Sequence, residues 1–206
     1  MRGIRNRVRA HYSATIARHG PTPLGVDWQN MAAQQLRFVQ LLRICDFAAP
    51  FSINDFGCGY GALLDYLKLR HPGAKLTYRG VDLAPAMITQ AEERWGKRPR
   101  TTFAVASHCD GIADYSLASG VFNVRLGEPL AAWEAYVRSI LVDLRAHSQI
   151  GFAVNFMLPH DARRTERELY RTQPELWVKF CHKRLGCSVE ILTDYGLREF
   201  TLLART

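Results

Sequence analysis

The chain has 206 residues, of which 48% are hydrophobic and 22% are charged, and its net charge at pH 7 is +8. These values are typical of one globular domain and exclude a disordered or fibrous protein. No apolar run reaches the roughly 20 residues that cross a bilayer, and no secretory signal is visible, so we expect a cytoplasmic protein.

The five cysteines are odd in number and include no Cys-x-x-Cys pair. This pattern indicates reduced thiols. Cys181, His182 and Cys187 are close together in the sequence, but they lack a fourth ligand at a suitable spacing. We therefore expect ordinary packing for these residues and no metal site.

The amino-terminal segment is basic, and no acidic residue precedes Asp27. Its arginines are Arg2, Arg5, Arg7 and Arg9. We interpret this segment as a solvated tail, although nucleic-acid arms and organelle transit peptides can have the same composition. After it we expect helices at 11–18 and 28–44, because apolar residues of the second segment recur with helical spacing. A loop rich in glycine and proline separates them.

Strands and helices alternate from residue 52 onwards. Strands are predicted near 52–56, 75–81, 101–106, 113–119 and 150–157, with helices near 61–70, 85–95 and 130–147. This alternation implies right-handed crossovers and a parallel sheet with helices on both faces. A helical insertion near 161–185 precedes two strands near 188–193 and 198–204, which meet at a Tyr195-Gly196 turn.

A glycine-rich turn follows the first predicted strand, in the stretch Ile-Asn-Asp-Phe-Gly-Cys-Gly-Tyr-Gly-Ala that begins at residue 53. Gly57, Gly59 and Gly61 let the backbone approach a ligand, and the helix that starts there favours anionic groups at its amino-terminus. Asp82 ends the next strand, where a carboxylate can accept two hydrogen bonds from a ribose diol. Together these features predict a nucleoside-containing cofactor at the carboxyl edge of the sheet.

The spacing of these glycines is G-x-G-x-G, whereas dinucleotide-binding proteins carry G-x-G-x-x-G. With the preceding Asp55, it resembles motif I of the class I S-adenosylmethionine-dependent methyltransferases. The resemblance continues through 81–87, 114–122 and 200–205. The arrangement of the whole chain is similar to a bacterial small-molecule subgroup of undefined substrate.

This resemblance implies an α/β fold with a Rossmann-like seven-stranded sheet, mostly parallel with an antiparallel carboxyl-terminal hairpin and with helices on both faces. It also implies a single domain, in which 1–49 form a helical extension over the cofactor site and 50–206 form the core. The cofactor would be S-adenosyl-L-methionine, with S-adenosyl-L-homocysteine as product. An amino-terminal region that belongs to the fold argues against a cleaved transit peptide.

The resemblance assigns the amino-acid end of the cofactor to the glycine loop and Asp55, and the ribose to Asp82. The other cofactor candidates are Leu83, Met87, Ser119, Arg37 and Trp28. Asp55 could instead cap a helix, Met87 could be a core residue, and Arg37 could clamp the methionine carboxylate or an acidic substrate. The position that follows strand three, where an acidic residue is common, falls around 107–109 and has none.

The acceptor site is less well defined. The Asn/Asp-Pro-Pro-Tyr/Phe motif of enzymes that methylate nucleobase amines is absent from 119–124, where the chain reads Ser-Gly-Val-Phe-Asn-Val. The substrate candidates are Tyr12, His19, Gly120, Phe122, Asn123 and Asn155, although Phe122 could equally pack inward. His160 and Tyr195 are weak candidates for a general base, and no catalytic residue stands out.

We expect in-line methyl transfer to oxygen or nitrogen of a small molecule, by a monomer or homodimer that interacts with neither membrane nor nucleic acid. The alternative is an RNA or protein methyltransferase that uses the basic amino-terminus. A third hypothesis is a degenerate domain that binds the cofactor and transfers nothing. Scattered basic residues without interleaved aromatic side chains disfavour single-strand nucleic-acid binding.

Overall fold

In a computed structural model, which describes residues 1–159 and 168–206, the central feature is a sheet whose strand order is β3-β2-β1-β4-β5-β7-β6. The described part of the chain contributes seven strands to it: β1 (Phe51–Phe56), β2 (Leu76–Asp82), β3 (Thr101–Val105), β4 (Ala113–Ala118), β5 (Ser148–Met157), β6 (Ser188–Leu192) and β7 (Glu199–Arg205). Strands β1 to β5 pair in parallel, and β7 runs antiparallel to both β5 and β6. The predicted fold class is therefore confirmed.

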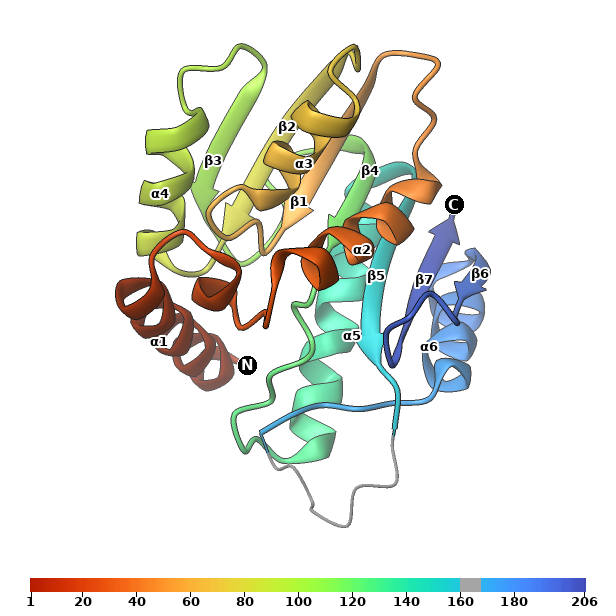
Figure 1. Cartoon of the computed structure of the whole chain (residues 1–206). Helices are drawn as coiled ribbons and strands as arrows, with labels where there is room; N and C mark the ends of the chain where they lie inside the picture. The colour runs from red at the N-terminus through yellow and green to blue at the C-terminus, as the bar shows by residue number, and fades with distance from the viewer. Residues whose placement is uncertain (160–167) are drawn as a thin grey trace.

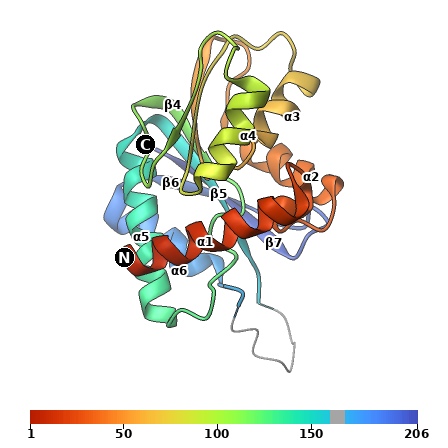
Figure 2. The ribbon, with the colours of Figure 1, turned by 90° about the vertical axis from the view of Figure 1, so that its left-hand side faces the viewer.

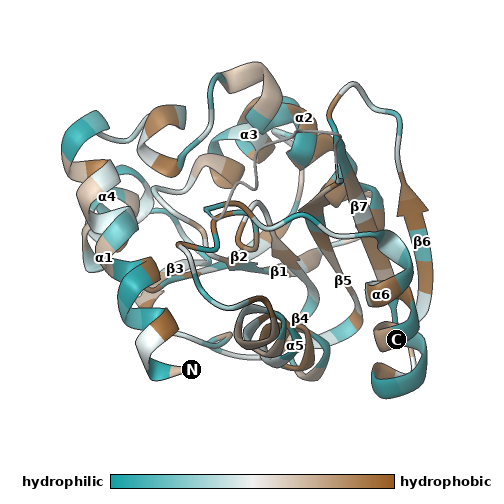
Figure 3. Ribbon diagram, turned by 90° about the horizontal axis from the view of Figure 1, so that it is seen from below, coloured by the Kyte–Doolittle hydropathy of each residue, from teal (hydrophilic) through white to brown (hydrophobic). Residues whose placement is uncertain are grey.

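Helices cover both faces of the sheet (Figures 1 and 3). One face carries α2 (Met31–Leu41), α3 (Ala62–Arg70) and α4 (Pro85–Trp95), and the other carries α5 (Leu130–Ala146) and α6 (Pro174–Phe180). Three further helical turns are η1 (Pro23–Val26), η2 (Leu42–Ile44) and the π-helical η3 (Cys181–Leu185). Each face of the sheet has its own hydrophobic core, because successive side chains of a strand point to opposite faces.

Helix α5 illustrates how the sequence produces this packing. Its buried residues are Trp133, Tyr136, Val137, Ile140, Leu141 and Leu144, which recur at intervals of three and four. That spacing places them on one face of an α-helix. The face packs against β4 and β5, and the β5 ribbon is hydrophobic along most of its length (Figure 3).

The amino-terminal helix differs from the prediction. Helix α1 spans Arg2–His19, so the basic segment is its first half, and the predicted start at residue 11 was wrong. Ile4, Val8 and Ile16 are buried on one side of it, at multiples of four residues. Exposed Arg2, Arg7 and Arg9 lie between and beside these apolar residues. The high charge of the segment made the helical spacing of its apolar residues hard to detect in the sequence. Helix α1 lies below the carboxyl ends of β1, β2 and β3 (Figures 1 and 2).

The insertion before β6 also differs from the prediction. Within the part of the insertion that the structure describes, helix begins at Pro174, whereas Leu169 and Arg171 form isolated bridges to Val124 and Met157. The first part of the predicted insertion, 161–167, lies outside the described residues. The predicted helix at 28–44 is divided into α2 and η2. The other predicted elements lie within two residues of the observed ones.

Candidate active site

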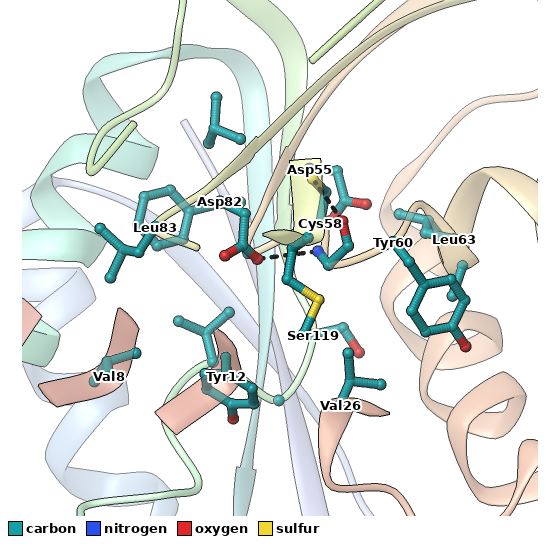
Figure 4. A pocket seen from close by; sticks show the side chains of 18 of the residues that line it. Val8, Tyr12, Val26, Asp55, Cys58, Tyr60, Leu63, Asp82, Leu83 and Ser119 are labelled. Atoms are coloured by element: carbon teal, nitrogen blue, oxygen red, sulfur yellow. Dashed lines mark hydrogen bonds between the residues drawn. The ribbon is translucent and has the colours of Figure 1, made fainter. Parts of the chain in front are cut away.

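The candidate site lies at the carboxyl edge of the sheet, where the loops after β1, β2 and β4 meet. These parallel strands end side by side, so their connecting loops share one edge. A cavity opens between them and is closed from outside by α1 and the η1 segment (Figure 4). We call it the cofactor cavity. Its lining includes Val8, Asp55, Gly57, Gly59, Leu63, Asp82, Leu83, Met87, Ala106, Ser119 and Tyr136.

The glycine loop is held in a conformation that L side chains rarely adopt. Gly57, Gly59 and Gly61 have φ angles of 74°, 54° and 84°. The backbone N–H groups of Gly57 and Cys58 donate to the Val81 carbonyl at 2.8 and 3.0 Å, which fixes the loop against β2. A Cβ at Gly57 would also lie 2.6 Å from Val121. The loop therefore requires glycine for its backbone angles and, at residue 57, for space.

Asp82 at the end of β2 binds the glycine loop directly. Its Oδ2 accepts a hydrogen bond from the Gly59 N–H at 3.0 Å (Figure 4). Its Oδ1 accepts one from the Ala84 N–H at 2.8 Å. Burial raises the pKa of this carboxyl, and the backbone donors oppose that shift. A carboxylate has about four lone-pair positions. Both oxygens therefore keep capacity to accept hydrogen bonds from a ligand.

Asp55 lies deeper in the same cavity. It is buried and accepts a hydrogen bond from the Tyr78 hydroxyl. Burial, partly opposed by that hydrogen bond, raises the pKa of the Asp55 carboxyl to about 7. A cationic group of a ligand beside it would favour the ionised form. A titratable carboxyl therefore lines the cofactor cavity, and its contact with an ammonium group stays a prediction.

Ser119 gives an independent test of the fit to a cofactor. Its hydroxyl oxygen is buried, lines the cavity and has no hydrogen-bond partner among the described residues. A buried polar group without a partner is costly, so a ligand that bonds it gains affinity. The glycine loop, the two carboxyls and this hydroxyl fit the polar groups of a nucleoside-containing cofactor, while Leu83 and Met87 provide apolar contact.

A second, larger cavity of about 710 Å³ adjoins the first, and we call it the acceptor cavity. Tyr12, Val26, Trp28 and Gly120 line both cavities. The acceptor cavity is also lined by His11, Asp27, Arg37, Asn123, Met157, Glu168, Arg171, Arg198 and Glu199. Its volume lies within the roughly 300–1,000 Å³ of small-molecule sites.

Gly120 is required by the wall between the two cavities. Its φ is 71°, and a Cβ there would lie 2.1 Å from the Trp28 ring. The Gly120 N–H donates to Asn155 Oδ1 at 2.7 Å, and Asn155 Nδ2 donates to Glu199 Oε2 at 2.9 Å. Asn155 lines neither cavity and holds the Gly120 backbone in place through this hydrogen bond.

Arg37 is engaged by the protein itself. Its guanidinium forms a buried two-point ion pair with Glu199, in which Nε donates to Oε2 at 2.7 Å, and it donates a further hydrogen bond to the Ala33 carbonyl. The guanidinium carbon also lies 3.7 Å from the centre of the Trp28 ring. Arg37 lines the acceptor cavity and not the cofactor cavity, so a cofactor carboxylate would have to compete with Glu199.

Several candidates lie away from both cavities. Phe122 is fully buried and stacks on Phe156 with ring centres 5.0 Å apart, which is the inward packing considered for it. His19 is exposed at the end of α1. Tyr195 contacts the Thr201 hydroxyl at 3.1 Å, and burial raises its pKa to about 12, so it stays protonated at neutral pH. His160 lies outside the described residues.

Sequence reasoning missed His11 and Asp27 of the acceptor cavity, as well as other lining residues such as Glu199. His11 Nε2 lies 2.6 Å from Asp27 Oδ2. The pair joins α1 to the turn that follows η1, and its members are 16 residues apart. No local spacing links them, and only the absence of acidic residues before Asp27 set that residue apart.

Metal-ligating side chains gather elsewhere, at the end of α5. Cys109, Asp143 and His147 offer ligand atoms within 4.8 Å of one another. However, Asp143 already accepts a hydrogen bond from the Cys109 N–H at 2.8 Å. Burial and the Asp143 carboxylate raise the pKa of the Cys109 thiol, which disfavours the thiolate that binds metals. This cluster is therefore explained by packing.

None of the described helices has the length and apolar character needed to cross a membrane.

Comparisons with known proteins agree with this geometry. Residues 53–141 match a family model described as a methyltransferase domain. Over 165 residues the chain is 45% identical to the provisionally named methyltransferase Rv1506c of Mycobacterium tuberculosis, which covers 80% of this chain and 98% of that protein.

Two solved structures are similar in fold. Magnesium protoporphyrin IX methyltransferase (ChlM) from Synechocystis PCC 6803, with bound SAM, has a TM-score of 0.67 at 17% identity, covering 98% of this chain and 96% of that one. Human N-acetylserotonin methyltransferase (ASMT), in complex with SAM, has a TM-score of 0.61 at 15% identity, covering 84% and 52%. At such identities the likeness concerns the fold alone.

Proposed function

Since the chain belongs to the family of S-adenosylmethionine-dependent methyltransferases, we propose that it methylates an oxygen or nitrogen atom of a small molecule by in-line displacement. The observation that carries this proposal is the pair of adjoining cavities with a common wall of Tyr12, Val26, Trp28 and Gly120. One cavity carries the cofactor-binding groups, and the other has the volume of a small-molecule site.

The residues of the cofactor cavity have separate roles in this proposal. Asp82 binds the ribose, and Asp55 with the glycine loop binds the amino-acid end. Ser119 supplies one further hydrogen bond, while Leu83 and Met87 cover the adenine. When bound, the cofactor supplies an activated methyl group. The protein contributes chiefly by aligning the acceptor beside it, which is worth up to about 7–11 kcal/mol in favourable cases.

The alternative, methylation of RNA or protein, rested on the basic amino-terminus. In the structure that segment is a helix that buries Ile4 and Val8, and Arg7 forms an ion pair with the buried Glu128. The similar structures are named for methylation of magnesium protoporphyrin IX and N-acetylserotonin, which are small molecules. These observations favour a small acceptor.

The first test is calorimetric titration with S-adenosylmethionine, S-adenosylhomocysteine and NAD. We expect micromolar binding of the two sulfur compounds and none of NAD. Product formation is then measured as S-adenosylhomocysteine released with a panel of small hydroxyl, amine and carboxyl compounds, and with RNA and protein in parallel. Turnover of RNA or protein alone would refute the small-molecule proposal, and cofactor binding without any turnover would favour a degenerate domain.

A further inference from the structure

The pair formed by His11 and Asp27 lies in the wall of the acceptor cavity. His11 is on the third turn of α1, and Asp27 follows η1 in the left-handed region at a φ of 61°. The two side chains are each 32% exposed. They are therefore neither sealed in the core nor freely solvated, and a molecule in the cavity would contact them.

We propose that His11, oriented by Asp27, is the general base that removes a proton from a hydroxyl group of the acceptor. This inference rests on the proposed function and names the acceptor class, a hydroxylated small molecule. If Nε2–H donates to the Asp27 carboxylate across the 2.6 Å contact, Nδ1 keeps its lone pair and serves as the base. A carboxylate acceptor would need no base, so the pair would have no role there.

The acceptor O–H bond breaks and its proton moves to His11 Nδ1, while the oxygen electron pair forms the new bond to the methyl carbon. The carbon–sulfur bond of the methyl donor breaks, and its electron pair stays on sulfur. The resulting imidazolium is stabilised by Asp27 until water removes the proton.

Asn123 supplies a second, independent observation in the same cavity. Its side chain is 3% exposed, and neither its amide oxygen nor its amide nitrogen has a hydrogen-bond partner among the described residues. A buried amide without partners is costly unless a ligand bonds it. It offers one acceptor and two donors side by side. This matches a molecule that carries a second hydroxyl or a carbonyl in addition to the reacting hydroxyl.

Other charged groups surround the pair. On α1, Tyr12 adjoins His11, and burial raises its pKa well above the ordinary value, so it stays protonated. Arg7, one turn earlier, is paired with Glu128. The other charged residues that line the acceptor cavity are Glu168, Arg171, Arg198 and the ion pair of Arg37 with Glu199. Among the described residues that line this cavity, His11 is the only histidine, and Asp27 is the anion in direct contact with it.

The first test uses 4-nitrocatechol, a probe whose absorbance distinguishes the ionised from the neutral hydroxyl. The protein is saturated with S-adenosylhomocysteine and titrated at a pH below the first ionisation of the free probe. We expect the bound probe to show the ionised spectrum in the wild type and the neutral spectrum in H11Q, with D27N shifted in the same direction as H11Q. H182Q changes an exposed histidine outside both cavities and should match the wild type.

A neutral spectrum in the wild type, an unchanged spectrum in H11Q, or no binding at millimolar probe would overturn the inference. Binding of S-adenosylhomocysteine, measured separately by calorimetry, distinguishes this failure from failure of the proposed function. Melting temperatures of the variants show whether the pair merely ties α1 to the η1 turn.

The second test is the pH profile of kcat with hydroxyl acceptors. We expect H11Q to lower kcat about 100-fold or more near neutrality and to recover as pH rises, because hydroxide then replaces the base. The Kd of the cofactor should stay unchanged. If carboxylic acids alone are methylated, or if H11Q retains full kcat at every pH, His11 is not the base.

Discussion

Replacing Asp82 tests the cofactor assignment most directly. In the structure its carboxylate bonds the Gly59 and Ala84 N–H groups, so it both holds the glycine loop and faces the cavity. A ribose diol bound to the remaining lone pairs would make two charge-assisted hydrogen bonds, each worth about 1.5–3 kcal/mol. Taking the low end, D82A loses about 3 kcal/mol of binding free energy. The Kd for S-adenosylhomocysteine should then rise about 100-fold.

The assay is calorimetric titration of D82A, D82N and D110A. Asp110 is exposed and lines neither cavity, so its variant controls for the loss of one negative charge. D82N keeps one acceptor oxygen and should fall between the wild type and D82A. D82A also leaves the Gly59 and Ala84 N–H groups without their acceptor. The free energy of unfolding in urea measures how much stability this loss costs, separately from the loss of cofactor binding. An unchanged Kd in a folded D82A protein would refute the placement of the ribose at this carboxylate.

Three further predictions concern the cavity walls and their charges. The pKa of Asp55 in the folded protein is about 7, above its ordinary 3.8, so the folded protein binds that proton more tightly than the unfolded chain. The free energy of unfolding should therefore fall as pH rises from about 4 to about 7. D55N should remove this pH dependence in urea titrations. G120A, whose Cβ would meet Trp28, should weaken S-adenosylhomocysteine binding at least tenfold by calorimetry. R37M leaves Glu199 buried without its partner and should lower the free energy of unfolding in urea by about 3–5 kcal/mol.

Controls for these variants follow from the structure. G73A alters a glycine with open space around it and no positive φ, and should leave binding unchanged. R37M combined with E199L removes both charges and should recover much of the stability lost in R37M. A pH slope that persists in D55N would assign the titration to another group. Equal binding by G120A and the wild type would mean that Trp28 can move away without cost.

The grouping of the cofactor candidates at one edge of the sheet could be predicted because its determinants are local in sequence. The glycine loop, the strand before it and Asp82 at the end of the next strand are each fixed by short segments, and parallel pairing brings their ends together. Ser119 follows the same rule at the end of β4. The sequence could not show that the Ser119 hydroxyl is buried without a hydrogen-bond partner among the described residues, because that depends on all the residues that pack around it.

The acceptor side depends on contacts that no local pattern encodes. Arg37 and Glu199 are 162 residues apart, and nothing in either segment indicates the other. After β4, Phe122 is buried in the core, whereas the neighbouring Asn123 lines the acceptor cavity. The sequence alone therefore made both residues substrate candidates and could not decide which of them packs into the core.

Helix α1 explains why the amino-terminal segment was misjudged and why it matters for function. A solvated tail and an amphipathic helix with a narrow apolar stripe have nearly the same composition, and only the four-residue spacing of Ile4, Val8, Tyr12 and Ile16 separates them. That stripe places Val8 and Tyr12 over the cofactor cavity. The sheet supplies the cofactor-binding loops that the fold requires, whereas the walls shared by both cavities come largely from α1 and the η1 segment. We therefore predict that the first thirty residues contribute to acceptor recognition, because His11, Tyr12, Asp27 and Trp28 line the acceptor cavity.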